Sequence, residues 1–202
     1  MPKLTVTHKR YDPDALAAWV ARRRNALPFS ARSADFVRLL KRKVRGRSAR
    51  THRFFGEAFV ASQTVHREAY YGSFKWLTNP RFARDRKLAA KDQERFRLAL
   101  RDHFGQKRID KLQRVVAQMS WTCRKALARK SPTAPDLWLV DRWGHHRFIE
   151  VKLPGDSVAP HQLAGMAAIG AVLGTANVSV EVVHLNNEDR LFKEFCRAIL
   201  NG

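Results

Sequence analysis

Cysteine and long apolar runs are both scarce in this chain, and each scarcity excludes a class of protein. Only two cysteines, Cys123 and Cys196, occur in 202 residues, and neither belongs to a CxxC pair. We therefore expect core thiols in a reducing compartment, and no disulfide framework or cysteine-based zinc site. No apolar run approaches the roughly 18 residues of a membrane span, and no signal-peptide pattern follows Met1. The expected location is intracellular, in the cytoplasm, nucleoid or nucleus, and the protein is not expected to be secreted.

Acidic residues are also few. The 18 Asp and Glu stand against 39 Lys and Arg, which gives a formal net charge of +21. Residues 1–130 hold 33 Lys and Arg against 10 Asp and Glu, whereas residues 131–202 hold 6 against 8. This division predicts a first part that meets a polyanion and a second part that holds a packed site. Nucleic acid is the expected polyanion, because a membrane-binding protein would need an apolar segment that the chain lacks.

The first 130 residues are expected to form a basic α-helical region, distinct from residues 131–202. Apolar residues recur in it at helical spacing, and capping residues or glycine mark the ends of the segments. The expected helices cover residues 15–24, a segment that begins at Ser33, residues 51–71, residues 88–104 and residues 109–128, with Gly105 between the last two.

The helix that begins at Ser33 has an unusually cationic side. A run of basic residues is most simply a solvated helix face, but the near absence of acidic residues around this one favours contact with phosphates. The candidate nucleic-acid-binding residues are Arg38, Lys41, Arg42, Lys43, Arg45, Arg47 and Arg50.

The periodicity changes after the segment Ser131–Pro135, which is rich in proline and stops the helical pattern. Strands are predicted over residues 136–141 and 147–152, joined as a hairpin around Gly144. A helix over residues 161–173, a strand over residues 178–185 and a helix over residues 187–200 follow. Strands and helices in this order predict an α/β fold with a mixed β-sheet flanked by helices.

Three polar residues stand out on the predicted hairpin. Asp136 begins its first strand, and the period of two places Glu150 and Lys152 on the same face of its second strand. Two carboxylates suit Mg²⁺, which prefers oxygen ligands, and the backbone carbonyl of Val151 could add a third oxygen. Each feature alone has a simpler interpretation, a capped turn for Asp136 and an exposed ion pair for the other two. Their combination on apolar strands favours metal-dependent phosphodiester hydrolysis.

These residues resemble the PD-(D/E)xK nuclease superfamily, and specifically its VRR-NUC branch. The resemblance covers residues 131–186 and rests on Pro135-Asp136, on Phe148-Ile149-Glu150-Val151-Lys152, on Pro154-Gly155-Asp156 and on Gln162. It implies a restriction-endonuclease-like core, Mg²⁺ or Mn²⁺ as cofactor, and action on branched or flapped DNA in repair or recombination. It also implies that Asp136, Glu150, Lys152 and Gln162 are catalytic.

The branch uses a further glutamate from an upstream helix. Phe55-Gly56-Glu57-Ala58-Phe59 is similar to the Gly-Glu element in the nuclease domain of the Fanconi-associated nuclease, which favours Glu57 as catalytic residue and metal ligand. Glu68 is the competitor. On one continuous helix the two would lie about 16 Å apart, too far to share a metal ion.

Other residues permit two interpretations. His145 and His146 are expected in a solvated turn, although they could be metal ligands, and His161 could touch a phosphate. Trp121, Trp138 and Trp143 are expected in the core, although exposed tryptophans could stack on unpaired bases. The spacing of Gly165, Gly170 and Gly174 would allow close packing of a partner helix, which makes a homodimer possible.

Two other functions compete with a nuclease. A noncatalytic nucleic-acid-binding protein that retains a nuclease fold would explain the charge excess alone. A ribosome- or RNA-associated basic protein would also explain the charge, but it would leave Asp136, Glu150 and Lys152 without a role.

Overall fold

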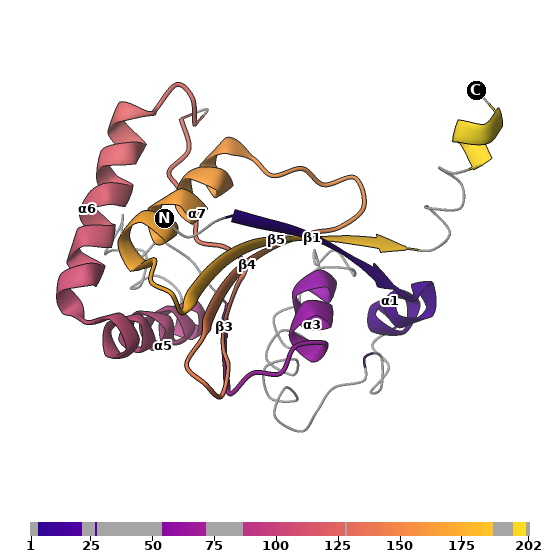
Figure 1. The fold of residues 1–202 in the computed structure, drawn as a ribbon, viewed down its shortest axis with the longest axis horizontal. Helices are drawn as coiled ribbons and strands as arrows, with labels where there is room; N and C mark the ends of the chain where they lie inside the picture. Colours follow the sequence, from indigo (N-terminus) through magenta and orange to yellow (C-terminus); the bar gives the residue numbers. More distant parts are fainter. Residues whose placement is uncertain are drawn as a thin grey trace.

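The computed structural model describes residues 4–21, 27, 54–71, 87–127, 129–187 and 196–200. A five-stranded mixed sheet runs through this part of the chain, and helices cover both of its faces (Figure 1). The elements in chain order are β1 (Leu4–Tyr11), α1 (Pro13–Val20), α3 (Phe55–Ser62), β2 (Glu68–Tyr71), α5 (Lys87–Phe104), α6 (Gln106–Thr122), β3 (Leu137–Val140), β4 (His146–Lys152), α7 (Pro160–Leu173) and β5 (Val178–Asn187). The expected α/β class is confirmed.

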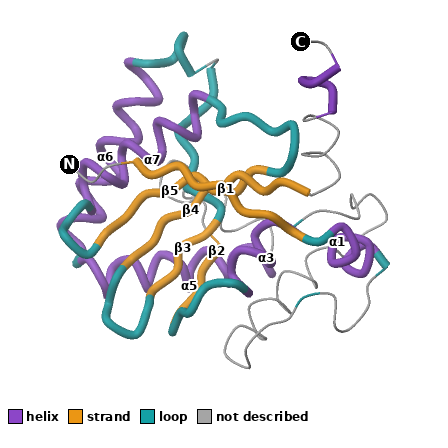
Figure 2. The backbone as a smooth tube through the Cα atoms, turned by 45° about the vertical axis from the view of Figure 1, so that its right-hand side comes forward, coloured by secondary structure: helices purple, strands orange, loops and turns teal. Residues whose placement is uncertain are grey.

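The strands lie in the order β1-β5-β4-β3-β2 (Figure 2). The β3–β4 hairpin is antiparallel, as its short connection requires, and β2 pairs antiparallel with β3. Helix α7 crosses over between β4 and β5, which are parallel, and β1 adds a further parallel strand on the other side of β5. All four residues of β3 are buried because helices cover both faces of the central strands.

Each face of the sheet packs a core of its own. On one face Trp138, Phe148 and Val180 pack against α5, α6 and α7. On the other face Leu137 and Ile149 pack against α1 and α3. The alternation along β3 and β4 therefore decides which side chains reach which layer.

Two strands in the first 130 residues correct the expectation of an entirely helical region. The helix predicted over residues 51–71 is wrong beyond Ser62, because Glu68–Tyr71 form an edge strand in which Tyr70 stacks on Trp138 with ring centroids 4.7 Å apart. Residues 4–11 form β1, which was not predicted although Leu4-Thr5-Val6-Thr7 alternates as a strand does. The sheet therefore crosses the predicted boundary at residue 130.

The other described elements agree with the sequence. Helix α1 starts where the side chain of Asp12 accepts a hydrogen bond of 2.8 Å from the backbone N–H of Asp14. Helices α5 and α6 meet at Gly105, whose φ of +80° favours glycine. Of the helix expected over residues 187–200, residues 196–200 are helical, residues 188–195 lie outside the described part, and β5 extends through Asn187.

Gly165 holds the segment before β3 against α7. A Cβ atom at this position would lie 1.7 Å from the carbonyl oxygen of Thr133, and the backbone N–H of Thr133 donates to the carbonyl of His161 at 3.1 Å. The interpretation of Gly165 as a contact for a partner helix is therefore wrong, since its face is occupied by the chain itself. This contact fixes the approach of Asp136, three residues beyond Thr133.

Two further expectations, about the cysteines and about membrane spans, can be compared with the structure. Cys123 and Cys196 are free thiols, but both are half-buried and neither is a core residue. In the part of the chain that the structure describes, none of the helices combines the length and the apolar character needed to cross a membrane.

Candidate active site

Strand β4 carries a buried ion pair. The Lys152 Nζ atom lies 2.9 Å from Glu150 Oε1, and the two residues are 6% and 1% exposed. Burial of both charges costs free energy that an ion pair alone seldom recovers, and replacement by apolar residues would often be neutral or stabilising. A pair kept at this depth therefore marks a candidate functional site.

Gln162, in the first turn of α7, ties the two charges together. Its Oε1 atom accepts hydrogen bonds from Lys152 Nζ at 2.8 Å and from the backbone N–H of Ala159 at 2.9 Å. Its Nε2 atom donates to Glu150 Oε1. Because two donors fix the carbonyl end of the amide, the amino end must face the carboxylate. The helix N-terminus thus locks the geometry of both β4 side chains.

Asp136 joins the site from the segment that leads into β3. Its Oδ2 atom accepts a hydrogen bond of 2.9 Å from the backbone N–H of Val151, which lies between Glu150 and Lys152 on β4. Burial raises the pKa of Asp136, and the nearby carboxylates of Glu150 and Glu57 raise it further, against the opposing effects of the Val151 N–H and Lys152. The carboxylates of Glu150 and Glu57 therefore each repel a negative charge on Asp136.

Glu57 reaches this cluster from the first turn of α3. The preceding residue, Gly56, lets the helix approach β4 closely, because a Cβ atom there would lie 2.9 Å from Val151 Cγ1. The charge of Glu57 raises the pKa of Asp136, so its carboxylate lies within electrostatic reach of Asp136. The Gly-Glu pair in the sequence therefore has a geometric basis: the glycine permits the contact that positions the glutamate.

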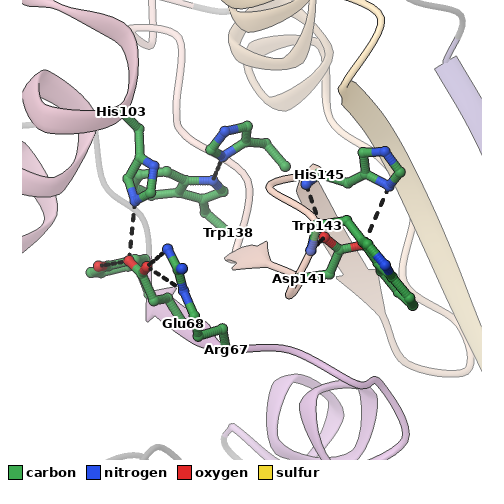
Figure 3. Close-up of polar contacts among 9 residues, drawn as sticks. Arg67, Glu68, His103, Trp138, Asp141, Trp143 and His145 are labelled. Carbon is green, nitrogen blue, oxygen red and sulfur yellow. Dashed lines mark hydrogen bonds and ion pairs between the residues drawn. The ribbon is translucent and has the colours of Figure 1, made fainter.

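Glu68 lies in a different polar cluster (Figure 3). Its Oε2 atom accepts a hydrogen bond of 2.6 Å from the Tyr70 hydroxyl and lies 3.1 Å from His103 Nε2, and its Oε1 atom pairs with Arg67. Burial raises the pKa of Glu68, but these hydrogen bonds outweigh burial and lower it to about 2. Of the two competing glutamates, Glu57 and not Glu68 lies within electrostatic reach of Asp136.

The site carries more negative than positive charge. Asp136, Glu150 and Glu57 stand against the single amine of Lys152, and hard oxygen donors of this kind suit Mg²⁺ or Mn²⁺. The residues thus fit a divalent cation in charge and donor type. Among the described residues no three acidic, histidine or cysteine side chains are grouped so that they could together hold a metal ion. Glu150 Oε1 contacts Lys152 and Gln162 instead. The Val151 carbonyl as a ligand stays a prediction.

His161, next to Gln162 on α7, lies at the margin of the site. Partial burial lowers its pKa, as do the neighbouring charges of Lys130 and Lys152, whereas Glu150 raises it. These effects place the ring within electrostatic reach of both buried charges. The seven basic residues of the predicted nucleic-acid-binding helix lie outside the described part of the chain.

The hairpin tip lies at the far end of β4 from this site. Asp141 Oδ1 accepts backbone hydrogen bonds from Trp143 and His145 (Figure 3), which makes the predicted solvated turn correct for His145. It is wrong for His146, which is 9% exposed and accepts a hydrogen bond of 3.2 Å from Trp138 Nε1. Burial first, and then His103, lower the pKa of His146, to about 4, in keeping with an unprotonated acceptor nitrogen.

The three candidate tryptophans divide between core and surface. Trp138 is fully buried, as expected. Trp121 and Trp143 are 79% and 65% exposed, so the core prediction is wrong for both, and the Arg142 guanidinium lies 4.1 Å from the centre of the Trp143 ring. Hydropathy alone predicts burial for all three tryptophans. It takes no account of the position of Trp143 in the turn between β3 and β4.

Comparisons with known proteins add no family assignment. A search of models of protein families found no match, and no curated protein matched the chain.

Proposed function

We propose that this protein is a nuclease that hydrolyses DNA phosphodiester bonds with the help of a divalent cation, Mg²⁺ or Mn²⁺. The observation that carries the proposal is the buried, hydrogen-bonded pair on β4, with two further carboxyl groups within electrostatic reach. Glu150 and Lys152 from β4 share hydrogen bonds with Gln162 from α7, and Asp136 and Glu57 complete the cluster. A restriction-endonuclease-like core of the VRR-NUC type is part of the proposal, supported by the order of elements from β3 to β5 and by the motif that they carry.

The proposed roles follow from the chemistry of each side chain. Asp136, Glu150 and Glu57 would hold the cation, whose contribution when bound is to activate a water molecule and to stabilise negative charge on the phosphate. Lys152 presents an amine at a fixed position, where it can offset charge that develops on the phosphate in the transition state. Gln162 orients Lys152 and Glu150, so the two β4 side chains keep one geometry relative to each other.

The charge of the chain supports a polyanionic substrate. A net charge of +21 favours binding of a phosphate backbone without reading of sequence. The choice of DNA over RNA, the preference for branched or flapped substrates and a role in repair or recombination rest on the resemblance to the VRR-NUC branch. An intracellular location follows from that substrate and belongs to the same proposal.

The test is cleavage of end-labelled flap, junction and linear DNA by the full chain with Mg²⁺ or Mn²⁺. We expect metal-dependent cleavage by the natural sequence and its loss in Asp136→Asn. Glu68→Gln is the matched control, because it removes a carboxylate that lies in the other cluster, and we expect it to cleave normally. Binding without cleavage of any substrate, with any of these ions, would favour the noncatalytic nucleic-acid-binding protein.

A further inference from the structure

A row of nitrogen-bearing side chains leads from the candidate active site to the edge of the sheet. In the parallel register of β4, β5 and β1, Lys152 lies beside His184, and His184 lies beside His8. The rings of His184 and His8, which we call the histidine pair, are stacked with centroids 5.3 Å apart. Neighbours in register point to the same face of a sheet, so all three side chains lie on the face that carries Glu150.

Exposure rises along this row from the site outward. Lys152 is 6% exposed, His184 is half-buried, and His8 is exposed. Leu4 and Val6, on the same face of β1, are 41% and 54% exposed, so no described helix covers this face of the strand. The row therefore connects a buried site with an open surface.

The electrostatic character of this face suits an anion. The positions of β1 and β5 on this face include no Asp or Glu, whereas His8, Arg10 and His184 all carry N–H donors. Partial burial lowers the pKa of His184, and electrostatic interactions with His8 and Lys152 lower it further. A phosphate placed over the three side chains would accept their N–H groups and offset the repulsion between their positive charges.

We propose that the histidine pair is a binding subsite for the phosphodiester backbone beside the bond that is cut. The subsite rests on the proposed nuclease function and names the path of the substrate strand: from Lys152 across β5 to β1. Two strand spacings separate Lys152 from His8, about 10 Å, which spans about three stacked nucleotides of one DNA strand. Each imidazole donates to a phosphate oxygen, and Arg10 extends the path along β1.

The experiment separates binding from chemistry. Binding is measured on the full chain carrying Glu150→Gln, alone and combined with His8→Ala or His184→Ala. Fluorescence anisotropy in the presence of EDTA gives the dissociation constant for an end-labelled DNA oligonucleotide. The kcat and KM of cleavage are measured on the same two substitutions with Glu150 intact. We expect the dissociation constant and KM to rise about tenfold for each, the worth of one hydrogen bond to a charged group, while kcat changes less than about twofold.

Two further sets of variants keep the result interpretable. Lys9→Ala removes a basic residue next to His8 that points to the opposite face of β1, so it should leave binding nearly unchanged. His8→Gln and His184→Gln retain an N–H donor and should recover most of the affinity. Recovery by glutamine, together with an unchanged midpoint of urea unfolding, excludes a purely structural effect of the alanine variants.

The outcomes distinguish the subsite from the nuclease function. Cleavage by the natural sequence with unchanged KM and dissociation constant in both alanine variants would overturn the subsite and leave the nuclease proposal standing. Absence of cleavage, together with weaker DNA binding in both variants, would overturn the nuclease function and leave the subsite as part of a DNA-binding surface. Equal losses in Lys9→Ala and His8→Ala would overturn the subsite as well, since they would indicate a diffuse effect of charge.

Discussion

At the scale of single residues, Lys152 is held tightly in the candidate site. Its amine lies 2.9 Å from Glu150 Oε1 and 2.8 Å from Gln162 Oε1 while the residue is 6% exposed. An amine held so tightly has little freedom to reorganise during a reaction, which is the property that electrostatic stabilisation of a transition state requires.

Replacement of this amine should therefore reduce catalysis far more than binding. We expect Lys152→Met to lower kcat at least about 100-fold, in line with the loss of one preorganised group at a charged transition state, with little change in KM. The comparison of kcat and KM on a labelled flap substrate checks this. Lys130→Met, a matched change at an exposed lysine near His161, should leave kcat within about threefold; a similar loss in both variants would contradict the assigned role.

The ionised side chain of Asp136 should lower the free energy of unfolding at neutral pH. Its pKa in the folded state is raised by burial and by Glu150 and Glu57. The folded state therefore holds this proton more tightly than the unfolded state does, and stability is lost as the pH rises from the ordinary Asp value through the raised pKa. We expect Asp136→Asn to increase the free energy of unfolding at pH 7 without metal, with the gain disappearing below about pH 4. Urea unfolding at the two pH values measures it, and a loss of stability at pH 7 would contradict the assignment.

Glu68 should behave in the opposite way. Burial raises its pKa, but the hydrogen bonds from Tyr70, His103 and Arg67 prevail and lower it to about 2. Its stabilisation is therefore present above the ordinary Glu value and is lost as the pH falls toward 2. We expect Glu68→Gln to lower the free energy of unfolding at pH 7 and to have little effect near pH 2, with cleavage unchanged. A variant that loses activity while keeping its stability would place Glu68 in the active site after all.

At the scale of elements, α7 organises the site by both of its contacts. Its first turn supplies Gln162 to the β4 pair, and Gly165 receives the Thr133 carbonyl of the segment that ends at Asp136. One helix thus sets the positions of groups from β4 and from the start of β3. Gly56 does the same for α3, whose approach to Val151 brings Glu57 within range of Asp136.

A methyl group at Gly165 should separate these elements. The added Cβ would meet a backbone carbonyl, which cannot rotate away as a side chain can, so we expect Gly165→Ala to lower the free energy of unfolding by about 1–3 kcal/mol. Gly170→Ala, at a half-buried position of the same helix, is the control, and we expect it to be neutral or stabilising by up to about 1 kcal/mol. Chemical denaturation of the three proteins provides the comparison. Equal stability of both variants would show that α7 and Thr133 are not packed as described.

The elements also show where sequence patterns are sufficient and where they are not. Helices α5 and α6, with Gly105 between them, and the β3–β4 hairpin follow from local periodicity and turn residues. Strand β2 does not, because Glu68–Tyr71 is only four residues long and continues a helical pattern; its pairing with β3 and the stacking of Tyr70 on Trp138 decide its conformation. Similarly, the burial of His146 depends on α5, because the ring centroids of Phe104 and His146 lie 4.6 Å apart.

At the scale of the whole molecule, the excess of positive charge would govern how the proposed nuclease binds DNA. The excess lies in residues 1–130, whereas four of the five proposed site residues lie in residues 131–202. Contacts of residues 1–130 with the phosphate backbone of DNA would therefore supply binding energy that positions a phosphodiester at residues 131–202.

This division predicts a steep dependence of DNA binding on salt. With six or more phosphates neutralised, affinity should fall by about 10³ or more between 50 and 200 mM salt. Replacement of Arg42, Lys43 and Arg45 by alanine should reduce the slope of log affinity against log salt by about 2.7. The same change at Lys107, Arg108 and Lys111, which are exposed in the first turns of α6, should reduce it less, because α6 begins at the His146 end of β4, away from Glu150. Equal reductions would contradict a dedicated binding segment.

Local sequence patterns predict the α/β class, most helix and strand positions and the charge division, and they place Asp136, Glu150 and Lys152 on or next to two apolar strands. These follow from periodicity and spacing, which act over a few residues. Packing of distant segments was needed to establish that Glu57 and not Glu68 lies within electrostatic reach of Asp136, that Gln162 bridges the buried pair, and that His184 and His8 continue the row from Lys152. These depend on strand register and on helix packing between segments distant in the chain, where one missing Cβ atom, at Gly56 or Gly165, sets how closely two elements approach.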